Sequence, residues 1–337
     1  MQIGNFDLEN KVLIVAEIGN NHEGNFEIAK ELVRQAAASG VAAVKFQTFS
    51  TEYFTSRSDP ARFARLKSFE LSHEQFTELA ELARSLGLLF ISTPLDLGSA
   101  AFLDPIVDAF KIASGDNDYY PLLADVAGRN KPLIISTGAS DLPQVSRTVR
   151  FVADQWKKNA APGQLALLHC VSSYPVPIEQ ANLLAIPFLA ENFAYPIGYS
   201  DHTRGIEAAL LAVALGARLI EKHFTLDQQF SDFRDHQLSA DPAEMRTLVQ
   251  AVAQASLMLG KFEKRIQPCE EPLTTAIRRS IVAGADLPAG HRLAFADLTW
   301  IRPAGEFGPG DEDQLIGKVL KRAVRFGEQL GRADVEP

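Results

Sequence analysis

Short apolar runs alternate with longer amphipathic segments along most of the chain. The segment 25–38 repeats apolar residues at helical spacing, and a capping box opens a second expected helix at 72–86. A last helix should begin at Asp241, with the following proline in its first turn. The apolar runs predict eight strands, at 12–16, 41–46, 88–92, 107–112, 132–136, 165–169, 195–199 and 217–221.

Eight strands that alternate with helices over about 250 residues predict a (β/α)8 TIM barrel, which we assign to residues 1–260. A doubly wound open sheet is the alternative α/β fold. It would need a glycine-rich phosphate loop after the first strand. That strand is instead followed by the segment Glu17–His22 (EIGNNH), which is no GxGxxG motif. The barrel is therefore the preferred interpretation.

The pattern changes after Gly260. Residues 261–275 are polar and contain two prolines, as is typical of a linker. Residues 276–337 contain short strand-like segments and turns, which predict a small β-rich domain. A domain of roughly 60 residues buries too little surface to be more than marginally stable alone. We therefore expect it to dock on a partner surface.

Composition narrows the class of protein. The chain has 337 residues, is 46% hydrophobic and carries a formal net charge of -9, which argues against nucleic acid as a partner. Cys170 and Cys269 form no CxxC motif, so neither a disulfide framework nor a zinc knuckle is expected. The N-terminus lacks the pattern of a signal peptide, and no apolar run reaches the roughly 18 residues of a membrane helix. We expect a cytoplasmic protein with no membrane partner.

Polar residues gather at the carboxyl ends of the predicted strands, where barrels of this type carry their chemistry. They are Glu17, Lys45, Gln47, Ser92, Thr93, Lys111, Ser114, Ser136, Thr137, His169, Ser172, Ser200, His202, Glu221 and His223. A single lysine or hydroxyl at such a place can be a solvated strand end or a helix cap. Two lysines at equivalent ends, with several hydroxyls, favour a pocket for phosphate and carboxylate groups.

His202 and His223 follow neighbouring strands, and each has a carboxylate residue close to it in the sequence. This arrangement predicts a pair of ligands for a divalent metal. Two imidazoles leave coordination positions open for water and substrate, which suits a catalytic site. By contrast, His169 in its apolar strand and His22 in an Asn-rich turn are interpreted as structural.

Several segments together identify a family. They include AEIGNNHEG at 16–24, VKFQ at 44–47, STP at 92–94, FKIASG at 110–115, STG at 136–138, HCVSSYP at 169–175, GYSDHT at 198–203, EKHFT at 221–225 and DH at 235–236. In this order they resemble the bacterial N-acetylneuraminate (sialic acid) synthase family, which includes related nonulosonic-acid and spore-coat polysaccharide synthases. The tail resembles the antifreeze-protein-like (SAF) domain of the same family.

The resemblance implies a transferase that condenses phosphoenolpyruvate with an open-chain N-acetylhexosamine, such as N-acetylmannosamine. The product would be a nine-carbon, sialic-acid-like keto acid, with phosphate released by C–O cleavage. His202 and His223 would hold the metal, most often Mn²⁺, with Mg²⁺ or Co²⁺ as alternatives. The family also implies a domain-swapped homodimer.

The same resemblance implies roles for individual residues. Those expected at the phosphoenolpyruvate are Lys45, Thr93, Lys111, Ser114, Ser136 and Ser200, with Ser172 as a further substrate-binding candidate. Those expected near the sugar or the proton transfers are Gln47, Tyr174 and the catalytic candidates Glu17, Glu221 and Asp235. Arg302 would reach the sugar site of the partner subunit.

Two segments depart from the family pattern, Phe233-Arg234 before the DH motif and Ala304–Pro309 after Arg302. Both belong to the expected sugar side, so the reaction type is better defined than the acceptor. Two other functions stay open at this stage. One is a Schiff-base aldolase that uses Lys45, Lys111 or Lys222, and the other is a non-catalytic sugar-binding paralogue.

Overall fold

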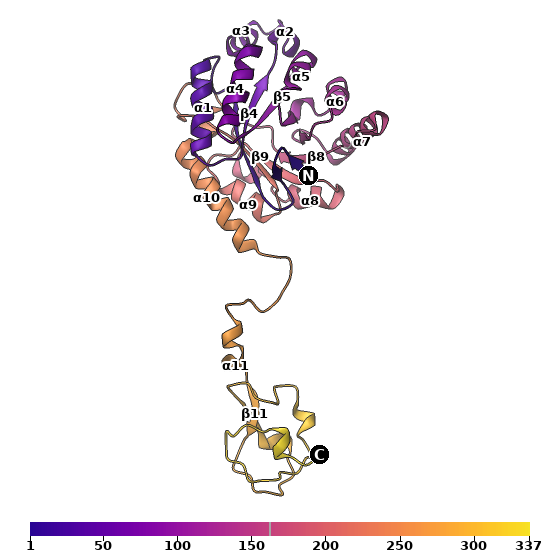
Figure 1. Cartoon of the computed structure of the whole chain (residues 1–337), viewed down its shortest axis with the longest axis vertical. Helices are drawn as coiled ribbons and strands as arrows, with labels where there is room; N and C mark the ends of the chain where they lie inside the picture. The colour runs from indigo at the N-terminus through magenta and orange to yellow at the C-terminus, as the bar shows by residue number, and fades with distance from the viewer. Residues whose placement is uncertain (162) are drawn as a thin grey trace. The chain divides into compact units, whose positions relative to one another are not determined.

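The computed structural model describes residues 1–161 and 163–337 and divides the chain into two compact units, Met1–Gly260 and Lys261–Pro337. In the first unit, eight strands among the described residues close into a barrel in the order β10-β3-β4-β5-β6-β7-β8-β9, and every neighbouring pair is parallel. The predicted TIM barrel is confirmed, and its helices surround the strands in Figure 1.

The strands of the barrel are β3 (Leu13–Gly19), β4 (Ala43–Thr48), β5 (Leu89–Pro94), β6 (Ala109–Ile112), β7 (Leu133–Ser136), β8 (Leu165–Cys170), β9 (Ile197–Asp201) and β10 (Leu219–His223). The helices are α1 (Phe26–Ala38), α2 (Thr51–Phe54), α3 (Pro60–Phe69), α4 (His73–Ser85), α5 (Leu97–Leu103), α6 (Tyr120–Ala127), α7 (Leu142–Asn159), α8 (Ala185–Asn192), α9 (Glu207–Ala214) and α10 (Pro242–Leu259). Each predicted strand overlaps an observed one. The capping box of α4 is present, and α10 begins with one as well.

Alternation along the strands makes the barrel interior apolar near the amino ends of the strands (the lower interior) and polar near their carboxyl ends (the upper interior). On β3, Leu13 and Val15 belong to the interior cluster, whereas Ile14 packs with the surrounding helices. Because side chains alternate between the two faces of a strand, the next inward position is Glu17. The same step leads from Ala43 to Lys45 on β4, from Ile91 to Thr93 on β5, from Ala109 to Lys111 on β6 and from Leu219 to Glu221 on β10.

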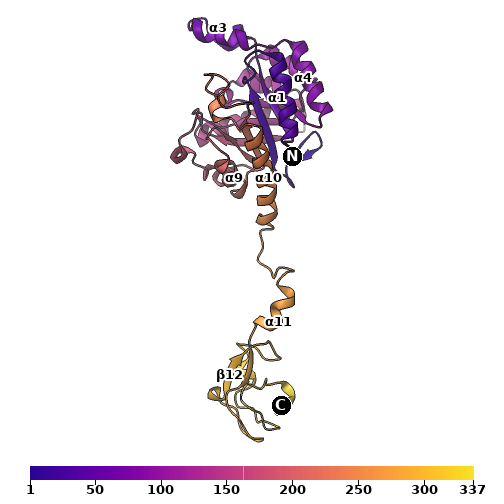
Figure 2. The ribbon, with the colours of Figure 1, turned by 90° about the vertical axis from the view of Figure 1, so that its left-hand side faces the viewer.

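An N-terminal hairpin that the sequence did not predict packs on the apolar lower interior. It consists of β1 (Gln2–Ile3) and β2 (Phe6–Asp7), paired antiparallel. Ile3 and the following Leu8 are fully buried among the first inward residues of the barrel strands. The amino-terminal end of the barrel is therefore covered. Helix α3, also unpredicted, lies at the end of the first unit away from the last turn of α10 (Figure 2).

The second unit has its own core. Strands β11 (Ser280–Ala283) and β12 (Leu298–Ile301) pair antiparallel and follow a short helix, α11 (Thr274–Ile277). Apolar side chains from the whole unit, including Ile281 and Leu315, form one buried cluster. Both strands lie within residues 276–337, where the sequence predicted a small β-rich domain. Within the described residues, no helix is long and apolar enough to cross a membrane.

His22, in the loop after β3, should make the free energy of unfolding of the protein depend on pH. Its side chain is 1% exposed, its Nδ1 accepts a hydrogen bond from the Gly24 amide, and its ring centroid lies 6.1 Å from that of Phe46. Desolvation in this buried position lowers the pKa of His22 to about 4. Below its ordinary pKa the unfolded chain therefore binds a proton that the folded chain does not.

We predict that His22 contributes stability that is complete above about pH 6.5 and is lost as the pH falls towards 4, on the order of 3 kcal/mol in total. His22→Gln should therefore show a flatter dependence of the free energy of unfolding on pH, measured by urea denaturation between pH 7 and pH 4. His73→Gln, at an exposed histidine, is the control and should match the parent slope. Equal slopes in all three proteins would contradict the prediction.

Candidate active site

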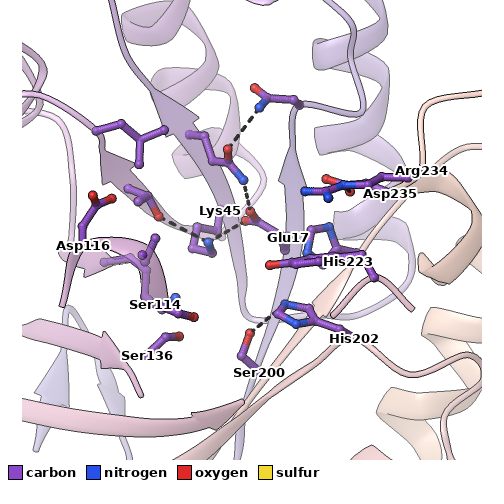
Figure 3. A pocket seen from close by; sticks show the side chains of 18 of the residues that line it. Glu17, Lys45, Ser114, Asp116, Ser136, Ser200, His202, His223, Arg234 and Asp235 are labelled. Carbon is purple, nitrogen blue, oxygen red and sulfur yellow. Dashed lines mark hydrogen bonds and ion pairs between the residues drawn. The ribbon is translucent and has the colours of Figure 1, made fainter. Parts of the chain in front are cut away.

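A cavity of about 630 Å³ opens at the carboxyl ends of the barrel strands (Figure 3). The candidates that line it are Glu17, Lys45, Gln47, Thr93, Lys111, Ser114, Ser136, Tyr174, Ser200, His202, Glu221, His223 and Asp235. The site candidates Ser172 and Arg302 do not line it, and neither do the strand-end residues Ser92, Thr137 and His169. Ser172 is exposed and is not among the lining residues, and Arg302 is exposed on the second unit. The structure thus brings together most of the residues that the strand ends predicted.

A cluster of buried charges occupies the floor of the cavity. Lys45 Nζ lies 3.0 Å from Glu17 Oε2 and 3.6 Å from Glu221 Oε1, and Lys111 Nζ lies 3.4 Å from Glu221 Oε2. All four side chains are at most 5% exposed. Buried ions are tolerated only when they are paired and hydrogen-bonded. Here each lysine faces a carboxylate, and Ser200 Oγ donates to Glu221 Oε1 at 2.9 Å.

The two carboxyl groups of this cluster have opposite pKa shifts. Burial alone would raise the pKa of Glu221, but Lys111, Lys45 and the Ser200 hydroxyl outweigh burial and lower that pKa to about 2. For Glu17, burial outweighs the attraction of Lys45, and the pKa is raised. Divergent pKa values in neighbouring carboxyls are typical of sites that separate a proton carrier from a permanent anion. Glu17 fits the first description and Glu221 the second.

The two lysines also differ. Burial lowers the pKa of Lys111 more than Glu221 raises it. For Lys45 the two carboxylates, Glu17 and Glu221, outweigh burial and raise the pKa. Lys45 Nζ also lies 3.3 Å from Thr93 Oγ1. Beside them, Gln47 donates to Glu17 and accepts from Asn20, at 3.2 and 3.0 Å.

His202 and His223 stand next to each other at the edge of this cluster. Their ring centroids are 5.4 Å apart, with planes at 62°. His202 Nδ1 lies 2.8 Å from the Val171 carbonyl oxygen, which can only accept, so Nδ1 carries the hydrogen. Nε2, which keeps its lone pair, lies 3.5 Å from Ser200 Oγ. His223 Nδ1 is buried and has no hydrogen-bond partner among the described residues. Burial lowers the pKa of both rings, most strongly for His223.

Neutral imidazoles, each with a lone pair on its unprotonated nitrogen, are the form that binds divalent metals, so this pair fits a metal site. Within residues 1–161 and 163–337, no group of three or more His, Cys, Asp or Glu side chains has the arrangement of a complete metal cage. A site built on His202 and His223 would therefore keep several positions open. The Tyr174 ring covers one side of it, with its centroid 4.2 Å from that of His202.

Next to the part of the cavity that Ser114 lines, three side chains crowd around Gly138, which does not itself line the cavity. A Cβ at this position would lie 2.4 Å from Ser172 Oγ, 2.7 Å from Cys170 Sγ and 2.9 Å from Ser114 Oγ, so only glycine leaves room for them. Ser136 Oγ is buried with no hydrogen-bond partner in the described part of the chain. A buried unsatisfied hydroxyl in a cavity that two lysines also line indicates a place where a ligand oxygen binds.

The wall above the histidines contains residues that the strand ends did not indicate. Arg62 and Arg65 reach the cavity from α3, and Phe54 reaches it from α2. Arg234 Cζ lies 4.6 Å from the centroid of the Tyr174 ring, and its Nε is 3.3 Å from Asp235 Oδ1. Their sequence signal is weak, because they belong to an insertion after β4 and to a long loop after β10.

Two further carboxyls line the upper part of the cavity. Burial raises the pKa of Asp235 in spite of the attraction of Arg234. Burial and the nearby Asp118 raise the pKa of Asp116 to about 6. Asp116 was not among the candidates. It follows Ser114 and Gly115 in the sequence, so its proximity to a strand end was the available signal.

Comparison with known proteins agrees with this geometry. Residues 32–264 match the NeuB family and residues 278–336 match the SAF domain. The chain is 44% identical to an uncharacterised protein of Methanocaldococcus jannaschii, over 93% of this chain and 90% of that one. It is 39% identical to the N,N'-diacetyllegionaminic acid synthase of Legionella pneumophila, over 94% and 92%.

Among solved structures, the N-acetylneuraminic acid synthetase of Leptospira borgpetersenii in complex with citrate has a TM-score of 0.76 and 35% identity. That match covers 81% of this chain and 94% of the other. The family match extends over more than half of the sequence, and the relatives align along nearly their full length. With its parallel barrel and its SAF domain, this chain belongs to the NeuB family.

Proposed function

We propose that this protein is a nonulosonic acid synthase, which condenses phosphoenolpyruvate with an open-chain N-acetylhexosamine or a related amino sugar. The observation that carries the proposal is that one cavity contains Lys45, Lys111 and the Ser136 hydroxyl, unpartnered among the described residues, together with two neutral imidazoles. The first group of residues suits an anion with phosphate and carboxylate, and the second suits an aldehyde oxygen. The names of the relatives support the same reaction class.

The hydroxyl side of the cavity is where the phosphoenolpyruvate phosphate would bind. Lys111 lies on this side, as do Ser114 and the unsatisfied Ser136 hydroxyl. Phosphate oxygens each accept several hydrogen bonds, so converging hydroxyls and an ammonium group satisfy them. Lys45 and Thr93, already 3.3 Å apart, would take the carboxylate. In this proposed arrangement the methylene carbon would face the histidines.

The acceptor sugar would bind between the histidines and the wall formed by Tyr174, Arg234 and Asp235. When bound by His202 and His223, a divalent metal such as Mn²⁺ supplies Lewis-acid chemistry that makes the aldehyde carbon electrophilic. In the reaction the methylene carbon bonds to that carbon, water adds to the former enol carbon, and phosphate leaves with its bridging oxygen. Glu17 and Asp235, whose pKa values are raised, are placed to hold or accept the protons.

We predict that catalysis depends on both imidazoles and on a chelatable metal. His202→Ala and His223→Ala should each lower turnover by orders of magnitude and should weaken Mn²⁺ binding measured by calorimetry, because each removes one of few protein ligands. EDTA should inactivate the parent protein reversibly. The control is His73→Ala, at an exposed histidine. Full phosphate release in excess EDTA would contradict the metal assignment.

Lys111 should determine the affinity for phosphoenolpyruvate. A charge-assisted hydrogen bond contributes roughly 1.5–3 kcal/mol, so Lys111→Met should raise the KM for phosphoenolpyruvate about tenfold to a hundredfold and change the KM for the sugar much less. Lys67→Met, on exposed α3, serves as the control. A phosphate-release assay over a panel of aldoses measures both constants. Equal weakening of both substrates would indicate a general collapse of the cavity.

A Schiff-base aldolase is the second candidate, because burial lowers the pKa of Lys111, as in many imine-forming lysines. The parent protein and Lys111→Met distinguish the two reactions. If an imine forms, borohydride with pyruvate would leave a 1-carboxyethyl group on the parent protein but not on Lys111→Met, because hydride reduces the imine to a secondary amine. We expect no added mass in either protein.

We further propose that the active site is completed by the partner subunit in a domain-swapped homodimer, with Arg302 of the second unit at the sugar. The support is the family resemblance of the SAF domain and the exposure of Arg302 after β12. Two inactive proteins, His202→Ala and Arg302→Ala, should regain activity when they are mixed under conditions of subunit exchange. Each mixed dimer would contain one intact barrel and one intact tail that can meet.

Subunit exchange in this experiment is followed by native mass spectrometry. Recovered activity supports completion in trans. Exchange without recovery would mean that Arg302 acts within its own subunit or has no role in the reaction. Each variant alone, taken through the same exchange conditions, is the control and should stay inactive.

A further inference from the structure

A fully buried ion pair lies between β9 and β10, on the sequence positions next to the candidate active-site residues. Lys222 Nζ is 3.0 Å from Asp201 Oδ2, and the two side chains are 1% and 0% exposed. The register of the two strands places Asp201 opposite Lys222. Neither residue lines the cavity, so this pair does not contact a substrate bound there.

The pair also fixes the residue that follows His202. Lys222 Nζ donates to the Thr203 carbonyl oxygen at 2.5 Å. Asp201 Oδ1 accepts from the Thr203 amide at 2.8 Å and from its hydroxyl at 2.7 Å. Thr203 is thus held through its amide, its carbonyl and its side chain, and it is 2% exposed. These hydrogen bonds hold the turn at the end of β9 in one conformation.

Alternation along the strands explains why such a pair can affect the site without touching it. Asp201 stands between Ser200 and His202, and Lys222 stands between Glu221 and His223. The neighbouring residues point inward, where Ser200 bonds to Glu221 at 2.9 Å, and the ion pair points to the other face. The two strands are therefore joined on both faces at the height of the imidazoles.

We propose that Asp201 and Lys222 are positioning residues that set the separation and the orientation of the His202 and His223 rings. This inference rests on the proposed function, in which these rings hold the metal. Outer groups that orient metal ligands commonly change metal affinity tenfold to a hundredfold when they are replaced. A buried ion pair that served stability alone would not change the affinity of a protein that remains folded.

The test compares two double variants with neutral side chains in place of the pair. Asp201→Asn with Lys222→Gln keeps groups that can hydrogen-bond between the strands, whereas Asp201→Asn with Lys222→Met does not. Neither leaves a buried unpaired charge, so both should fold. Circular dichroism and thermal melting check the fold. Calorimetry gives the Mn²⁺ affinity, and visible absorption of the Co²⁺-loaded protein reports the geometry of the ligands.

The Met-containing double variant should bind Mn²⁺ at least tenfold more weakly than the parent and show an altered Co²⁺ spectrum. The Gln-containing one should lie closer to the parent in both respects. The KM for phosphoenolpyruvate should change less than threefold, because most of its proposed ligands, such as Lys45, Thr93 and Ser136, are on β4, β5 and β7. The control replaces another ion pair, Asp125 on α6 and Arg129 just after that helix, with neutral residues. This variant should bind Mn²⁺ like the parent.

Unchanged Mn²⁺ affinity and an unchanged Co²⁺ spectrum in a folded Met-containing variant would overturn the inference. If neither double variant folds, Thr203→Val decides, because it removes only the hydroxyl that donates to Asp201. A several-fold loss of Mn²⁺ affinity in Thr203→Val supports positioning, and parent-like affinity contradicts it. A parent protein that binds no Mn²⁺ would instead contradict the proposed metal site itself.

Discussion

The arrangement of the site depends on one electrostatic constraint, the mutual neutralisation of Lys45, Lys111, Glu17 and Glu221 inside the barrel. An isolated ion at such depth would be costly, since burial opposes the charged form of every one of these groups. The ammonium and carboxylate groups therefore have to be placed together. The parallel register of the strands does this by bringing equivalent inward positions to one level.

This neutrality has a consequence for substrate binding. Two lysines and two glutamates leave the floor of the cavity without net charge when all are ionised, and the two histidines are neutral. A strongly anionic substrate must then share its ammonium partners with carboxylates that are already in place. The proposed divalent cation would add the positive charge that the side chains lack. The Ser136 hydroxyl, which has no partner among the described residues, contributes a donor without adding charge.

Most of the barrel and of its inner site could be predicted from the sequence, because both follow from alternation within single strands. Lys45, Lys111 and His223 each end an apolar run, and the fold then determines where they point. The N-terminal hairpin could not be predicted in this way, since its two strands contain two residues each. Nor could the Asp201–Lys222 pair, whose partners are defined only by the register between two strands. Periodicity within one segment contains no information on such pairings.

The residues proposed for the reaction and those proposed for the choice of acceptor sugar also differ in how far the sequence predicts them. The inward residues of the strands are fixed by the closed barrel, whereas the wall on the sugar side comes from α2, α3 and the loop after β10. In that wall Phe233 packs on Phe69 of α3 at 5.3 Å between ring centroids, and Arg234 stacks on Tyr174. The Phe233-Arg234 departure from the family pattern therefore shapes the surface that an acceptor sugar would meet. Under the proposed function, variation in this wall would alter the choice of sugar, and the charged floor would keep the chemistry of phosphoenolpyruvate.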